Sequence, residues 1–108
     1  MNLEIMESKL ISLNNLIAEF TDRSGAADRP RIKKYLIDIL RKNHELNIDM
    51  SSIRSLSPSF AYEIFGKLID EFRENVVEYI HFTNDERQLS DRIKAAFDRR
   101  KLILKKTA

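Results

Sequence analysis

Apolar residues recur at helical spacing in three segments of the chain. The first pattern predicts a helix over about 30–43, which Pro30 can open because its missing N–H costs nothing in a first turn. A broader apolar face over about 58–73 predicts a second helix, with Ser57 as its N-cap. A third helix is expected to follow Asn84-Asp85 and to run to about residue 100. The residues that carry these patterns are Ile32, Leu36, Ile39 and Leu40; Ala61, Ile64, Phe65, Leu68, Ile69 and Phe72; and Leu89, Ile93, Ala96 and Phe97.

Two segments between these helices favour strands. Residues 46–50 alternate apolar and polar side chains, and 76–83 are rich in β-branched and aromatic residues, as in a central strand buried on both faces. On that interpretation His81 is a structural histidine inside the sheet. Strands that alternate with helices predict parallel pairing through a right-handed crossover.

The N-terminal third permits two interpretations. Residues 9–13 could form a strand that completes the sheet, or 3–20 could form an amphipathic helix. Residues 21–28 are expected to form a loop around Gly25. Gly66 interrupts a helical pattern, where glycine costs about 1 kcal/mol relative to alanine, and we expect it to allow close packing against another element.

Composition limits the class of protein. The chain has 108 residues, 43% of them hydrophobic and 33% charged, with a net charge of +2, which suits one globular domain and does not by itself indicate nucleic-acid binding. We expect a single domain over 1–108, with an N-terminal strand or helix and loop over 1–29, a core over 30–102 and a basic tail over 103–108. No apolar run has the roughly 20 residues of a membrane span, and no signal peptide is evident. A cytoplasmic protein is expected.

The sequence lacks the residue patterns of the common enzyme classes. It has no cysteine, and its two histidines, His44 and His81, do not stand at the spacing of a metal site. No glycine-rich phosphate loop is present. We therefore expect a non-catalytic protein without a metal or cofactor.

The segment 47–61 stands out, because a predicted strand ends in an acid and serines, and further serines then open a helix. A helix start offers unpaired N–H groups and partial positive charge, so it tolerates a phosphoserine. A phosphate there adds nearly two negative charges, which can repel one partner or recruit another. Ser57 is expected to cap the helix, and Ser59 falls in its first turn.

This segment resembles the STAS fold of bacterial anti-anti-sigma factors, and more closely a STAS-like family of unknown function. The similarity rests on Asp49 and Ser51 after the strand, and on Ser57, Ser59 and Phe60 at the helix start. It continues through 80–84 (IHFTN) and 91–101 and covers about residues 30–102.

The resemblance implies an α/β fold with a small sheet of three or four mostly parallel or mixed strands packed against helices. It also implies a regulatory protein whose partner is a histidine-kinase-like ATPase, with Ser59, or alternatively Ser57, as candidate phosphoacceptor. Anti-anti-sigma factors usually have Asp-Ser-Ser-Gly at this helix start, whereas this chain has Ser-Pro-Ser-Phe. The expected partner-binding residues are Asp49, Ser51, Ser52, Arg54, Ser57, Ser59 and Tyr62.

Two alternative functions remain open at this point. The basic tail from Arg99 to Lys106, with Lys33 and Lys34, could contact nucleic acid, although cations also favour the last turn of a helix because they offset its macrodipole. The segment 1–20 could instead be the interface of a homo-oligomeric scaffold protein. No membrane association is expected.

Overall fold

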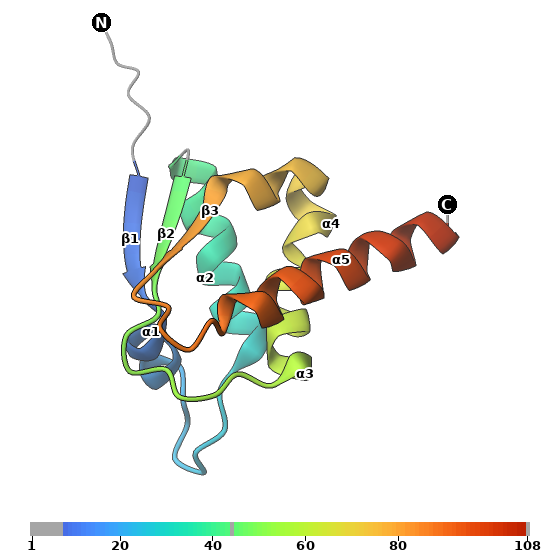
Figure 1. Ribbon diagram of the computed structural model, residues 1–108. Coiled ribbons are helices and arrows are strands. Elements are labelled where there is room, and N and C mark those ends of the chain that lie inside the picture. Colours follow the sequence, from blue (N-terminus) through green and yellow to red (C-terminus); the bar gives the residue numbers. More distant parts are fainter. Residues whose placement is uncertain (1–7, 44, 108) are drawn as a thin grey trace, which may run out of the picture.

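The computed structural model describes residues 8–43 and 45–107 (Figure 1). Its elements follow the order strand, helix, helix, strand, then a helical region in several parts, a strand and a long last helix. They are β1 (Ser8–Ser12), α1 (Leu13–Glu19), α2 (Arg29–Lys42), β2 (Glu45–Asp49), α3 (Pro58–Ala61), the π-helical turn η1 (Tyr62–Gly66), α4 (Leu68–Phe72), the 3-10 helix η2 (Glu74–Tyr79), β3 (Ile80–Thr83) and α5 (Ser90–Thr107).

The described sheet has three parallel strands in the order β1-β2-β3. The predicted α/β fold and parallel pairing are therefore confirmed. Leu46 and Ile48 of β2 are buried, whereas Glu45, Asn47 and Asp49, which point to the opposite face, are only half-buried. Helices α2, α4 and α5 lie on the side of the buried residues (Figure 1).

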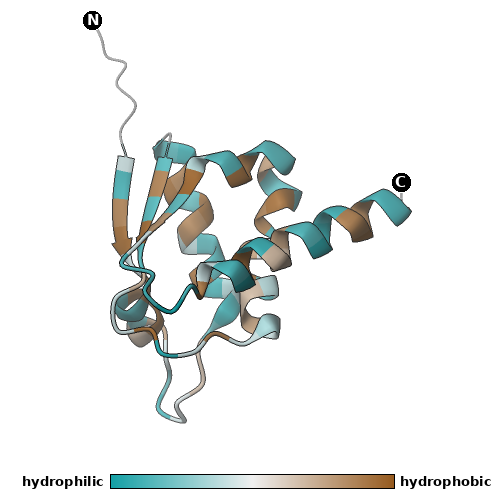
Figure 2. Ribbon diagram, in the orientation of Figure 1, coloured by the Kyte–Doolittle hydropathy of each residue, from teal (hydrophilic) through white to brown (hydrophobic). Residues whose placement is uncertain are grey.

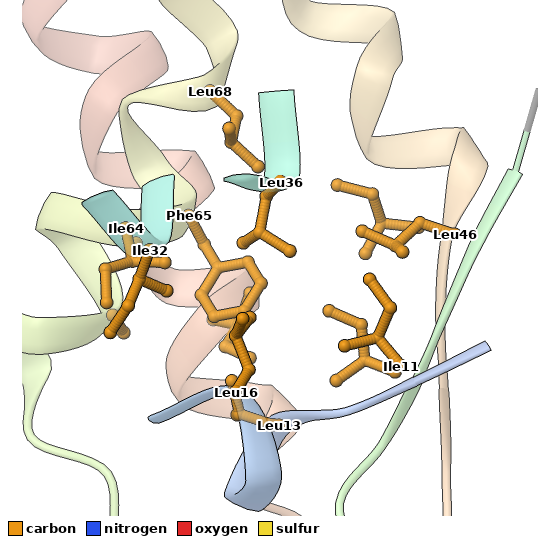
Figure 3. Close-up of a cluster of buried hydrophobic side chains, with 14 of the residues drawn as sticks. Ile11, Leu13, Leu16, Ile32, Leu36, Leu46, Ile64, Phe65 and Leu68 are labelled. Carbon is orange, nitrogen blue, oxygen red and sulfur yellow. The ribbon is translucent and has the colours of Figure 1, made fainter. Parts of the chain in front are cut away.

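The core lies between the sheet and these helices. Phe65 is fully buried, and Figure 3 shows its ring among leucines and isoleucines from both the helices and the sheet, including Leu36 and Leu16. Figure 2 shows the matching distribution along the ribbon, with brown apolar residues alternating with polar ones on the strands and on the helices. Fully burying one such apolar side chain contributes about 1.5–3 kcal/mol, so this core can hold the helices against the sheet.

Most of the predicted elements are present at nearly the predicted positions. The helix predicted over 30–43 is α2, and the strand predicted over 46–50 is β2. The last helix is longer than predicted, because α5 continues to Thr107. In the N-terminal third the strand interpretation is confirmed by β1, and a single helix over 3–20 is wrong because the described part of that range is helical only from Leu13 to Glu19. The part of that prediction that falls on residues 3–7 lies outside the described residues.

The strand predicted over 76–83 is wrong in its first half. Arg73 adopts φ 71° and turns the chain, and Glu74–Tyr79 then form a 3-10 helix that buries Val76. Only Ile80–Thr83 form a strand, and β3 lies at an edge of the described sheet, not at its centre. Packing on the core has overridden the β propensity of the two valines.

The prediction for His81 is wrong for the same reason. His81 lies on the exposed face of the edge strand, and its Nε2 is 3.0 Å from Oε2 of Glu45 on the neighbouring strand. The side chains of this pair are 45% and 40% exposed, so the histidine is not part of the core.

The expectation of close packing at Gly66 is confirmed. A Cβ atom added there would lie 2.9 Å from the backbone oxygen of Ala96, closer than real Cβ contacts allow. Gly66 ends the π-helical turn, in which the N–H of Lys67 donates to the oxygen of Tyr62 at 3.2 Å. The glycine thus allows α5 to pack directly against the backbone of η1.

Candidate partner-binding surface

The link between β2 and α3, residues 50–57, is fixed to the core by three apolar side chains. Met50, Ile53 and Leu56 are buried, so the link is attached to the core along its length. The polar residues between them, including Ser51, Ser52 and Arg54, are exposed. The link is therefore fixed against the core by its apolar side chains and presents its polar side chains to solvent.

Asp49 organises the start of this link. Its Oδ1 accepts hydrogen bonds from the backbone N–H of Ser51 at 2.9 Å, from Ser51 Oγ at 2.6 Å and from Asn84 Nδ2 at 2.9 Å. These bonds, chiefly those from the Ser51 hydroxyl and Asn84, hold the pKa of the Asp49 carboxyl below its usual value. Ser52 follows with φ 68°, a left-handed conformation that closes the turn.

A polar hollow of about 310 Å³ lies beyond the carboxyl ends of β2 and β3. Its walls are the start of the link and the loop over 84–89, and its lining includes Ser51, Ser52 and Arg54. Three of the predicted partner-binding residues are thus brought together. Ligands of open α/β sheets bind beyond the carboxyl ends of the strands, so this edge is the side on which recognition is expected.

The two candidate phosphoacceptor serines have different environments. Ser57 Oγ accepts a hydrogen bond from the backbone N–H of Phe60 at 3.0 Å, and Ser57 is the predicted N-cap of α3. Ser59 is exposed, and its Oγ accepts a hydrogen bond from Arg29 Nη1 at 2.9 Å. The hydroxyl of Ser57 therefore supports the fold, whereas that of Ser59 lies at the surface beside a cation from α2.

Tyr62 belongs to a different cluster, on the side of α5. Its hydroxyl accepts a hydrogen bond from Arg100 Nη1 at 2.9 Å, and Arg100 also donates to both carboxylate oxygens of Asp70, at 2.8 and 2.6 Å. The bonds to Asp70 and then to Tyr62 raise the pKa of the Arg100 guanidinium above its already high usual value. The tyrosine ring also lines a largely apolar groove of about 330 Å³ between α3 and α5.

The predicted residues therefore form neighbouring parts of one surface and not a single pocket. Ser57 lines a smaller hollow with Arg54, next to the polar one, and Ser59 points toward α2. The sequence analysis did not identify Arg29 as the neighbour of Ser59, or Arg100 as the neighbour of Tyr62. These contacts join residues 30 and 38 positions apart, and no local pattern indicates them.

The basic residues named above have ordinary surface positions. Lys105 and Lys106 are in the last turn of α5, where cations offset the helix dipole. Lys34 lies 4.0 Å from Asp38 in an i,i+4 pair. In the N-terminal segment, Leu13 and Leu16 are buried in the core of this same chain, whereas Leu10 on β1 is 63% exposed.

The link belongs to a segment that matches a known protein family. Residues 30–89 match the model of a STAS-like domain of unknown function, DUF4325. The chain belongs to this family. The matched STAS-like segment extends from α2 to the loop over 84–89, so it includes the whole link, whereas β1, α1 and α5 lie outside it.

The other comparisons add no further relative. No curated protein and no solved structure matches the chain significantly. Over residues 8–43 and 45–107, no group of three or more His, Cys, Asp or Glu side chains is placed to hold a metal ion. No helix of the described part of the chain is long and apolar enough to cross a membrane.

Proposed function

We propose that this STAS-like domain is a non-catalytic regulatory module that binds a protein partner through residues 51–62. Phosphate on Ser59 switches that binding. The partner suggested by the resemblance to anti-anti-sigma factors is a histidine-kinase-like ATPase. The observation that carries the proposal is the contact between Ser59 and Arg29 at the exposed start of α3.

The environment of Ser59 suits a regulated hydroxyl. Phosphoryl transfer would form a bond between Ser59 Oγ and the γ-phosphorus of ATP, break the bond from that phosphorus to the β–γ bridging oxygen, and release ADP. The serine proton would pass to a base of the kinase. The product dianion would lie beside the Arg29 guanidinium, which forms stronger hydrogen bonds with phosphate than with a neutral hydroxyl.

Ser59 is a better acceptor than Ser57 on structural grounds. Phosphorylation of Ser57 would have to displace the hydrogen bond that caps α3. The hydroxyl of Ser59 makes no bond within its own helix, so its modification changes the charge of the surface without unwinding the first turn.

The test is affinity purification of the tagged full chain from its native host. Mass spectrometry would identify the co-purifying proteins and the modification state of the peptide spanning residues 50–67. A histidine-kinase-like ATPase together with phosphate on Ser59 is the expected result. Ser59→Asp should change partner retention at least about fivefold, and Asn14→Asp, which adds the same charge at an exposed position of α1, should not. Equal retention by wild type, Ser59→Asp, Ser59→Ala, Ser57→Ala and Tyr62→Phe would contradict the proposal.

A further inference from the structure

We infer that the groove between α3 and α5 binds an acidic segment of the partner protein. This inference rests on the proposed function and adds the chemistry of the contact. The groove is lined by apolar surface from Pro58, Tyr62, Ala95 and Ala96, with Arg92 and Arg99 also contributing to its lining. It can therefore receive an apolar side chain beside cationic groups.

The two arginines are positioned on one face of α5. They are seven residues apart, so they face the same side of the helix about 10.5 Å from each other along its axis. Both are exposed. Within residues 8–43 and 45–107, neither lies within 4.0 Å of a carboxylate oxygen, whereas their neighbour Arg100 is paired with Asp70.

Arg99 is nevertheless held in place. Its guanidinium carbon lies 5.0 Å from the centre of the Tyr62 ring, in a cation–π contact. Such a contact orients the guanidinium and leaves its N–H groups able to bind a further acceptor. An oriented but unneutralised cation is the feature expected of a site that recognises a carboxylate.

The groove continues toward the link. A second hollow, of about 300 Å³, is lined by Arg54, Leu56, Ser57, Leu89 and Arg92. Because Arg92 lines both hollows, they form one surface with three arginines, and Asp91 is the one acidic residue that lines it. Asp91 stands in the first turn of α5, where the helix dipole favours its charge.

An acidic protein segment fits this surface better than a nucleic acid does. Carboxylates can form bidentate hydrogen bonds with the guanidinium groups, and an apolar side chain between them can cover Ala95, Ala96 and Pro58. Bases of a single strand need an open aromatic face, and Arg99 already lies over the ring of Tyr62. The spacing of the two arginines corresponds to acids three residues apart in a polyproline II segment, where they share a face about 9 Å apart, or seven apart in a helix.

The first step of the test captures the occupant. The tagged full chain, with the photo-crosslinking residue p-benzoylphenylalanine in place of the exposed, groove-lining Ala95, is irradiated in the native host, and the attached peptide is sequenced. The expected adduct is a peptide of another protein with two acidic residues at one of the stated spacings and an apolar residue between them.

The second step measures how binding depends on charge. A labelled synthetic copy of the captured peptide is titrated against wild type, Arg92→Glu/Arg99→Glu and the matched control Lys94→Glu/Lys105→Glu at 0.15 M salt. Both control lysines are exposed on α5 and line neither hollow. We expect the arginine reversal to raise the Kd at least tenfold and the lysine reversal to raise it less than threefold. Circular dichroism melts verify that both variants fold.

Several results would overturn the inference. They are an adduct with nucleic acid, an adduct with a second copy of this chain, a peptide without paired acids, no adduct at all, or an equal loss of affinity in both double variants. If Ser59 variants still control partner retention while residue 95 captures nothing, the groove inference fails and the proposed function stands. If no partner co-purifies with the tagged wild-type chain, which keeps Ala95, the proposed function fails and the groove inference fails with it.

Discussion

A β-carbon on Gly66 would lie 2.9 Å from the backbone oxygen of Ala96, so these two residues fix the distance between η1 and α5. Replacing the glycine must move α5 or distort η1, and both elements line or adjoin the candidate partner-binding surface. The position of α5, and with it the width of the groove, therefore depends on the absence of one side chain.

Gly66→Ala should destabilise the protein by about 1–3 kcal/mol, as expected for overpacking in a close contact. The sign of the change is the informative part. If Gly66 stood in an open helix, alanine would stabilise the protein by about 1 kcal/mol through its higher helix propensity. Urea denaturation of the two proteins measures the difference, and a stabilised variant would contradict the close packing.

The two serines at the start of α3 should respond differently to alanine. Ser57→Ala removes the N-cap hydrogen bond to the N–H of Phe60 and should cost about 1 kcal/mol. Ser59→Ala removes only an exposed bond from Arg29 and should cost less than about 0.5 kcal/mol. Chemical denaturation of both variants tests this, and equal losses would show that the cap does not distinguish them.

Asp49 should make stability depend on acid pH. Its pKa in the folded protein is below the usual value of 3.8, so its contribution is complete above the unfolded pKa and is lost as the pH falls through the folded pKa. The free energy of unfolding should therefore decrease as the pH is lowered from about 5 toward 2. Asn84→Ala removes one of the bonds responsible and should make this decrease shallower.

Asp22 provides the comparison for that experiment. Its pKa is lowered too, chiefly by the hydroxyl of Ser24 and the N–H of Ala26, so it contributes over the same range of pH. Asp22→Asn should flatten the pH dependence without altering the effect of Asn84→Ala. If Asn84→Ala leaves the pH dependence unchanged, the bond between Asn84 and Asp49 is not formed in solution.

The contact among Tyr62, Arg100 and Asp70 should be measurable as a coupling energy. Tyr62→Phe and Asp70→Asn each remove a partner of the same half-buried guanidinium, so their effects on stability should not add. Each single change should cost about 0.5–1.5 kcal/mol, a range reduced because Asp70 is exposed. A double-mutant cycle by urea denaturation tests this, and additive losses would contradict a shared network.

The sequence predicted correctly those helices in which the apolar repeat and the capping signals at the start indicate the same boundaries. For α2 and α3, a proline in the first turn and a capping residue before it marked the start, and the apolar repeat followed. The prediction failed at 74–79, because Val76 and Val77 suit a strand but are packed on the core from a 3-10 helix. Local preference could not show that Arg73 turns the chain there.

The candidate surface was predictable only in part. Asp49, Ser51 and Ser57 make local hydrogen bonds within three residues, which is the range that a sequence pattern reveals. The residues that complete the surface, such as Arg29 beside Ser59 and Arg99 over Tyr62, come from elements that meet only in the folded chain. Nothing in the spacing of the arginines along α5 indicated which of them would lack a carboxylate partner.

The parallel arrangement of the strands also bears on how the chain folds. Ser8 pairs with Glu45 and Leu46 pairs with Ile80, so neither pairing can form before a loop of more than 30 residues has closed. The local helices can form first, but the sheet, and with it the edge from which the link emerges, must wait for these distant contacts. We therefore expect folding slower than that of a helical bundle of this length, with the candidate partner-binding surface among the last parts to be completed.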